Sequence, residues 1–225
     1  MSFEPNVERA RFNMIEQQIR PWEVLDPSVL SLLAEVRRED FVPPAYRALA
    51  FVDTEVPLVT ADGTREVMLA PKVEARMLQE LSVGRHETVL EIGAGSGFMA
   101  ALLALKARQV ISLEIHPELA RRAAENLARA GIHGASVRHM NGAAGLPGEG
   151  PFDVILLSGS VAAVPPALLA QLKVGGRLGA IVGQAPAMRA VRITRMDELG
   201  YASVDLFDTV APRLHGFEEP PRFHF

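Results

Sequence analysis

The sequence predicts an α/β protein: a doubly wound, mostly parallel β-sheet with helices on both faces, preceded by an N-terminal helical flank. Three observations lead to this prediction. From residue 88 onward, short β-branched runs alternate with helix-forming runs, which is typical of parallel strands joined by crossover helices. A glycine-rich turn at 93–97 joins one such pair, as in Rossmann-like folds that bind nucleotides. Residues 1–80 lack this alternation.

The composition limits the class of protein. The 225 residues are 48% hydrophobic, which suits one αβ unit with a modest extension, divided here into a flank at 1–80 and a ligand-binding domain at 81–225. The formal net charge is −4, with no basic cluster that would indicate nucleic acid. No signal-peptide pattern and no membrane-spanning apolar run is present, and there is no cysteine. We therefore expect a cytoplasmic protein without nucleic-acid or membrane partners.

The flank is predicted to be largely helical. One helix is expected at 7–19, where an Arg-Pro step ends it, and another at 26–36, where Asp-Pro supplies a capping residue followed by a first-turn proline. Residues 51–58 are expected to be extended, and a proline opens a third helix at 71–81. Residues 1–80 are therefore interpreted as a flank or lid that packs on the sheet.

The remainder of the chain alternates between strands and helices. Strands are expected at 88–92, 109–113, 135–140, 152–157, 177–182, 188–195 and 203–210, with helices from 98, at 117–130 and at 165–173. Gly175-Gly176 is expected to turn the chain into the strand that follows. The last two strands are candidates for an antiparallel edge, and their order is left open.

The glycine turn is the candidate ligand site. It reads Glu91-Ile-Gly-Ala-Gly-Ser-Gly97 and lies between a buried strand and a helix, so backbone N–H groups can face a ligand. A dinucleotide fingerprint requires a small residue five positions after its first glycine, and Phe98 is too large for that position. Glu114 ends the next strand, about twenty residues further on, where an acid can accept both ribose hydroxyls. The pattern predicts a nucleoside ligand and disfavours an NAD-dependent dehydrogenase.

Several motifs resemble one enzyme family. The glycine turn is similar to the first motif of Rossmann-like S-adenosylmethionine (SAM) methyltransferases. The other matching segments are Arg38-Glu-x-Phe-Val-Pro43, Pro151-Phe-Asp153, Gln171-Leu-x-x-Gly-Gly-Arg-Leu178 and Val182-Gly183. Together they resemble the protein-L-isoaspartate O-methyltransferase family over residues 14–214. The resemblance implies SAM-dependent methylation of the α-carboxylate of isoaspartyl residues in damaged proteins or peptides, with S-adenosylhomocysteine as the product.

The resemblance also implies a cofactor site. Its candidate residues are Glu91, Gly93, Ala94, Gly95, Ser96, Gly97, Glu114, Ile115, Asn141 and Gly142. The three glycines correspond to the family's methionine-binding turn, and Glu114 corresponds to its ribose-binding acid. Asn141 stands where the family has an aspartate near the adenine amino group, and its amide oxygen can still accept that hydrogen bond.

The methyl-transfer position departs from the family pattern. The segment Val67-Met-Leu-Ala70 is the candidate substrate pocket, and Leu69 takes the place of the family's active-site serine. Leucine cannot hydrogen-bond a substrate carboxylate, and the preceding loop, 59–66, is longer than is usual in the family. Ser158 and Ser160 are candidates for a replacement hydroxyl. No metal site is predicted, because the histidines show no ligand spacing and cysteine is absent.

Three functions remain open at this point. The first is isoaspartyl O-methylation. The second is methylation of a different, small or apolar carboxylate acceptor, which Leu69 favours. The third is a catalytically weak SAM-binding protein that acts through a partner. No sequence pattern indicates the oligomeric state.

Overall fold

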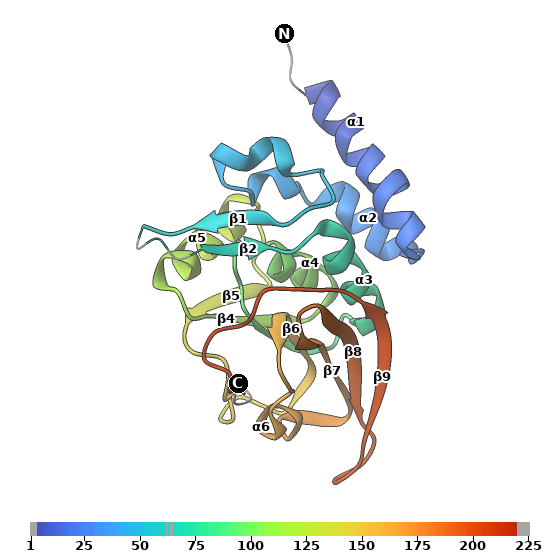
Figure 1. Cartoon of the computed structure of the whole chain (residues 1–225), viewed down its shortest axis with the longest axis vertical. Coiled ribbons are helices and arrows are strands. Elements are labelled where there is room, and N and C mark those ends of the chain that lie inside the picture. The colour runs from blue at the N-terminus through green and yellow to red at the C-terminus, as the bar shows by residue number, and fades with distance from the viewer. Residues whose placement is uncertain (1–3, 62, 64, 220–225) are drawn as a thin grey trace, which may run out of the picture.

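The computed structural model describes residues 4–61, 63 and 65–219. Its centre is a seven-stranded sheet with the order β5-β4-β3-β6-β7-β8-β9 (Figure 1). The strands are β3 (Thr88–Ile92), β4 (Gln109–Glu114), β5 (Ala135–His139), β6 (Phe152–Val161), β7 (Leu172–Gln184), β8 (Ala187–Arg195) and β9 (Tyr201–Asp208). The first five pair in parallel. β8 pairs antiparallel with β7 and β9, so the mostly parallel sheet with an antiparallel edge is confirmed.

Helices cover both faces of the sheet, unequally. The longer ones, α3 (Pro71–Leu81), α4 (Phe98–Lys106) and α5 (Pro117–Arg129), share one buried apolar cluster with Val89 of β3. The one-turn α6 (Pro166–Leu169) and Leu146 share a second cluster with Leu90, the next residue of β3. Because successive side chains of a strand point to opposite faces, β3 is buried on both sides, as its continuous apolar run predicts. None of the described helices has the length and apolarity needed to cross a membrane.

The N-terminal flank packs on the α3–α4 face. It contains α1 (Glu4–Met14), a π-helical turn η1 (Ile15–Ile19), the short 3₁₀ helices η2 (Arg20–Trp22), η3 (Arg38–Asp40) and η4 (Pro44–Leu49), and α2 (Pro27–Glu35). Asp26 caps α2 by accepting a hydrogen bond from the backbone N–H of Ser28 at 2.8 Å. Ile19 and Leu33 are fully buried in the same cluster as the sheet residue Val89. The described part of residues 1–80 therefore shares a core with the sheet.

A hairpin missed by the sequence analysis completes the flank. β1 (Val56–Val59) and β2 (Arg65–Met68) form a separate two-stranded antiparallel sheet. The hairpin is held to α5, since the backbone N–H of Ala61 donates to Glu118 and Arg122 donates to the carbonyl of Val59. In Figure 1 it crosses the molecule above the central sheet.

The segment before β7 differs from its prediction. The helix expected at 165–173 is only α6, because Leu172 instead pairs with Phe152 as the first residue of β7. Gly175 and Gly176 do not end an element; they lie inside β7, at a shift in its register with β6. Gly175 has φ +80, and a Cβ on Gly176 would lie 2.9–3.0 Å from backbone carbonyl oxygens. The glycines therefore permit a bulge rather than a turn.

A C-terminal strap, residues 211–217, follows β9. Figure 1 shows it passing beneath β2 toward the side of β4 and β5. The backbone N–H of Ser160 donates to the carbonyl of Pro212 at 2.7 Å, and that of Leu214 donates to the carbonyl of Ser160 at 2.9 Å. These bonds fix the strap across the carboxyl end of β6.

Candidate functional site

The glycine turn lies at the point where the strand order reverses. From β3 the chain runs outward through β4 and β5, and then returns to β6 on the other side of β3. Ligands of open α/β sheets bind in the crevice outside the carboxyl ends of the strands at such a point. Gly93, Gly95 and Gly97 have φ values of +94, +53 and +84, which residues with side chains rarely adopt. The turn therefore depends on its glycines.

Two adjoining cavities, of about 30 and 50 Å³, lie over this turn. The predicted residues that line the first are Val67, Met68, Leu69, Glu91, Gly93, Ala94, Gly95, Ser96 and Ser158. Those that line the second are Val67, Gly93, Gly95, Glu114, Ile115, Gly142 and Ser158. The structure thus brings the glycine turn, the acid of β4 and the segment around Leu69 to one place.

Glu114 joins the end of β4 to the glycine turn. One carboxylate oxygen accepts a hydrogen bond from the backbone N–H of Gly95 at 2.8 Å, and the other accepts from that of His116 at 3.0 Å. The residue is 5% exposed and lines the second cavity. Its side chain is therefore held at the position where the sequence predicts contact with the ribose.

Glu91 is a fully buried acid beneath the first cavity. Its two carboxylate oxygens accept hydrogen bonds from Ser112 at 2.6 Å and Ser158 at 2.8 Å. Burial raises the pKa of Glu91 to about 7, although both serine hydrogen bonds favour the ionised form. The Ser158 hydroxyl, a candidate for substrate contact, is thus engaged with Glu91.

A buried ion pair supports the segment around Leu69. Arg38, only 1% exposed, donates a hydrogen bond to the carboxylate of Glu74 on α3 and another to the backbone carbonyl of Leu69 at 2.8 Å. Its guanidinium carbon lies 4.8 Å from the centre of the Phe98 ring. Burial raises the pKa of Glu74, and the charge of Arg38 opposes this rise. The arginine of the Arg-Glu-x-Phe-Val-Pro motif thus connects the segment around Leu69 to the core.

Leu69, predicted from the sequence to take the place of the family's serine, lines the first cavity. Val67 and Met68 line the same cavity, whereas Ala70 precedes α3 and lines neither cavity. No hydroxyl therefore comes from residues 67–70. The described hydroxyls in this cavity belong to Ser96 and Ser158.

Three further predicted residues lie outside both cavities. Ser160 is completely buried, and its hydroxyl donates to the carbonyls of Ala211 and Pro212 in the strap. Gly97 opens α4, where a Cβ would lie 3.0 Å from the carbonyl oxygen of Ala123. Asn141 is exposed, and its side-chain oxygen accepts from the backbone N–H of Ala143 at 3.0 Å. These contacts give the three residues structural roles in the conformation described.

The strap supplies cavity residues that the sequence analysis missed. Leu214 and His215 line the second cavity, together with Glu66 from β2. A Cβ on Gly93 would lie only 2.7 Å from the side chain of Leu214. His215 and Glu66 are 149 positions apart in the chain, so no local spacing could have indicated their meeting.

Comparisons with known proteins show which family this chain resembles. The sequence profile of the family described as Protein-L-isoaspartate(D-aspartate) O-methyltransferase (PCMT) matches residues 9–209. The chain is 38% identical over 189 residues to the Protein-L-isoaspartate O-methyltransferase of Methanoculleus marisnigri, covering 84% of each chain. It is 40% identical over 190 residues to Protein-L-isoaspartate O-methyltransferase 1 of Anaeromyxobacter sp., covering 84% of this chain and 86% of that one.

Solved structures share the fold. A protein-L-isoaspartate O-methyltransferase superposes with a TM-score of 0.80 at 22% identity, covering 93% of this chain and 66% of that chain. A putative protein-L-isoaspartate O-methyltransferase from Plasmodium falciparum, in complex with S-adenosyl-L-homocysteine, gives 0.75 at 20% identity, covering 91% and 96%. At these identities the structures support the fold alone, whereas the profile and the curated relatives cover most of the sequence. The chain belongs to the protein-L-isoaspartate(D-aspartate) O-methyltransferase family.

Proposed function

We propose that this protein is a cytoplasmic SAM-dependent O-methyltransferase that methylates carboxylates, with isoaspartyl residues of damaged proteins or peptides as its first candidate substrate. The observation that supports this most is the meeting of the glycine turn, Glu114 and the segment around Leu69 at one crevice. Family membership supplies the reaction. A methyl-transfer assay with an isoaspartyl peptide, its aspartyl twin and several small carboxylic acids tests the proposal.

The residues at the crevice fit SAM. Gly93 and Gly95 line both cavities with bare backbone, and Glu114 lies beside them with its two oxygens accepting hydrogen bonds from N–H groups. SAM supplies an electrophilic methyl group on a sulfonium centre. The cavities, of about 30 and 50 Å³, are far smaller than the roughly 300–1,000 Å³ of ligand pockets. Binding therefore requires Leu214 and the strap to move away from Gly93.

The reaction requires little acid–base catalysis from the protein. A carboxylate with an ordinary pKa is ionised at pH 7, so it needs no general base to act as a nucleophile. The protein's part is to align the acceptor and exclude water, for which Val67, Met68 and Leu69 form an apolar wall. The pKa of Glu91 is raised to about 7, so a large fraction of its side chains is neutral near pH 7. A neutral Glu91 repels an anionic acceptor less than an ionised one would.

Replacement of Glu114 tests the cofactor site. We expect Glu114→Ala to weaken SAM binding by about 1.5–3 kcal/mol, roughly ten- to a hundred-fold, because charge-assisted hydrogen bonds to the ribose are lost. Glu114→Gln should fall between Glu114→Ala and the wild type. Calorimetric titration measures all three, with the surface variant Glu125→Ala as the control. Wild-type affinity in a folded Glu114→Ala, or binding of NAD but not SAM, would reject this assignment.

Replacement of Leu69 tests the acceptor. If Leu69 faces the transferred methyl, the wild type methylates isoaspartyl peptides weakly, and Leu69→Ser introduces a donor to the substrate carboxylate. One well-placed donor is worth roughly 1–3 kcal/mol, about ten-fold or more in transfer rate. Steady-state rates with the isoaspartyl peptide measure the gain, and Leu69→Ala is the control for a smaller side chain without a hydroxyl.

The second candidate function is methylation of a small or apolar carboxylate acceptor. It is favoured by the apolar side chains of residues 67–69 at the first cavity. On this view Leu69→Ser gains nothing with the isoaspartyl peptide and loses activity with a small acid. High wild-type activity on the isoaspartyl peptide, unimproved by the serine, would show that Leu69 does not limit the reaction.

A further inference from the structure

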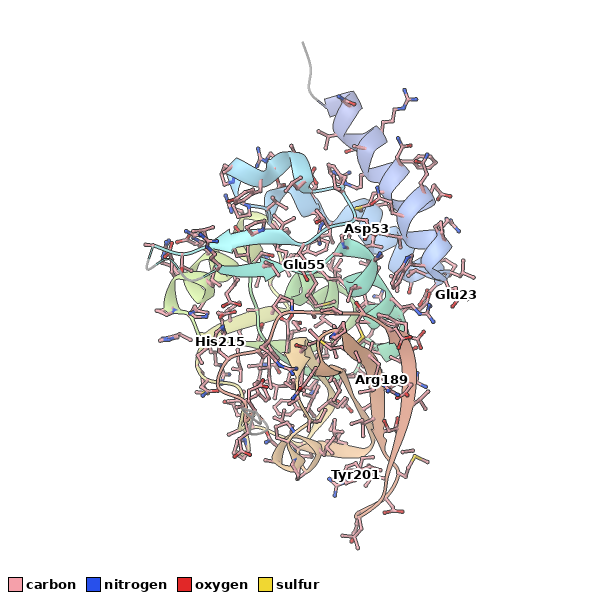
Figure 2. All side chains as sticks on the ribbon, viewed as in Figure 1. Glu23, Asp53, Glu55, Arg189, Tyr201 and His215 are labelled. Atoms are coloured by element: carbon pink, nitrogen blue, oxygen red, sulfur yellow. The ribbon has the colours of Figure 1, made fainter. Side chains whose placement is uncertain are left out.

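Two histidines and a glutamate from three distant parts of the chain meet at the rim of the second cavity. Glu66 comes from β2, His116 from the residue before α5, and His215 from the strap, where Figure 2 labels it. One oxygen of Glu66 lies 2.9 Å from Nε2 of His215 and 3.3 Å from Nε2 of His116. The three potential ligand atoms all lie within 4.8 Å of one another.

Two of these separations are close to those of ligands around one metal ion. Zinc bonds to imidazole nitrogen and carboxylate oxygen are about 2.0–2.2 Å long, so tetrahedral coordination places ligand atoms roughly 3.3 Å apart. The two nitrogen–oxygen distances, 2.9 and 3.3 Å, are near this value. His215 has a side chain that is 54% exposed, which leaves it room to bring its nitrogen closer to that of His116.

The nitrogen of His116 gives a second, independent indication. Its Nε2 atom is buried and has no hydrogen-bond partner among the described residues, although the Glu66 oxygen is near. Buried polar atoms are normally satisfied, and a neutral imidazole nitrogen is the commonest metal ligand in proteins. A metal between His116, His215 and Glu66 would satisfy it.

We propose that Glu66, His116 and His215 bind a divalent transition-metal ion of the zinc type. Two imidazoles and one carboxylate suit zinc, whereas magnesium and calcium prefer oxygen ligands alone. Three protein ligands leave one coordination position for water or another small ligand. This site was not expected from the sequence, because its ligands do not follow a local motif.

The metal would fasten the strap over the crevice. Glu66 belongs to the hairpin and His116 to the start of α5, and both are held by other contacts, whereas His215 belongs to the strap. Coordination therefore fixes Leu214, the neighbour of His215, against Gly93. Metal binding itself does not depend on the proposed function. Only the expectation that a fixed strap hinders the exchange of SAM rests on that function.

Metal titration of the full chain tests the site. With Zn²⁺ in calorimetry, and Co²⁺ followed by the visible absorption of its tetrahedral form, we expect one ion per chain. His116→Ala and His215→Ala should each weaken binding at least about ten-fold, since each removes one of three ligands. The control His133→Ala removes an exposed histidine outside the cluster and should bind like the wild type, and Mg²⁺ should not compete. No zinc binding, or binding unchanged by His116→Ala and His215→Ala, overturns the site.

A second measurement separates this inference from the proposed function. Zinc should slow amide hydrogen exchange in residues 211–217 of the wild type but not of His215→Ala, because only the wild type can anchor the strap. If zinc binds at these ligands without slowing that exchange, the fastening role is wrong. SAM binding measured without zinc reports on the proposed function alone, so the two can fail separately.

Discussion

Arg38→Met is expected to lower the free energy of unfolding by about 3–5 kcal/mol, because it leaves the buried carboxylate of Glu74 without its partner. Arg38 and Glu74 are 1% and 5% exposed, so water cannot solvate the carboxylate that is left unpaired. The substitution also removes the hydrogen bond to the carbonyl of Leu69. Urea denaturation followed by circular dichroism measures the loss. We expect methyl transfer to decrease as well, because the segment around Leu69 loses its support.

Two further variants identify the cause of this effect. Arg38→Met combined with Glu74→Leu removes both charges and should recover most of the lost stability, since an apolar pair can replace a buried ion pair. Arg121→Met removes an exposed partner of Glu125 and should change stability by no more than about 0.5 kcal/mol. If the double variant is no more stable than Arg38→Met, lost packing around Phe98 explains the effect instead of the unpaired charge.

Glu91 is expected to make stability fall as the pH rises through neutrality. Its pKa is about 7 in the folded protein, against the ordinary value of 4.5, so the folded state binds the proton more tightly. The resulting stabilisation is fully present below about pH 4.5 and is lost as the pH rises through about 7. Between pH 5 and pH 8 the loss is roughly 2–3 kcal/mol.

Glu91→Gln isolates this contribution. Glutamine stays neutral at every pH, so its stability relative to the wild type should rise by that amount from pH 5 to pH 8. Unfolding free energies at several pH values measure the difference, and Glu125→Gln, an exposed acid, should follow the wild-type profile. Parallel profiles for Glu91→Gln and the wild type would mean that Glu91 does not titrate in this range.

The sequence predicted the parallel strands well because burial on both faces leaves continuous apolar runs. It did not reveal β2 (Arg65–Met68), in which two polar residues precede two apolar ones and which forms a strand through pairing with β1. It also overextended α6, because the pairing of Leu172 with Phe152 outweighs local helix preference. In both places, contacts with another part of the chain decide the local structure.

The same limit applies to the site. The glycine turn and Glu114 were predictable because one strand–turn–helix–strand unit contains them all. Ser160 was expected at the same cavity as Ser158, but the register of β6 and β7 shifts between Leu156 and Ser160. The hydroxyl of Ser160 instead donates a hydrogen bond to a backbone carbonyl of the strap. Leu214 reaches Gly93 only because backbone hydrogen bonds fix the strap on Ser160. Such bonds are independent of side-chain type and leave no pattern in the sequence.

The strand order also affects the synthesis of the protein on the ribosome. β3 and β4 emerge early, but the other neighbour of β3 is β6, and the hydrogen bond from the N–H of Thr88 to Asp153 spans 65 positions. Until β6 has left the ribosome, one edge of the apolar strand β3 has no partner, and such an edge can pair with other chains. By contrast, β7, β8 and β9 are joined by residues 185–186 and 196–200, so their short loops close at low entropic cost. The nascent chain therefore carries this unpaired edge of β3 until residue 161 has been released.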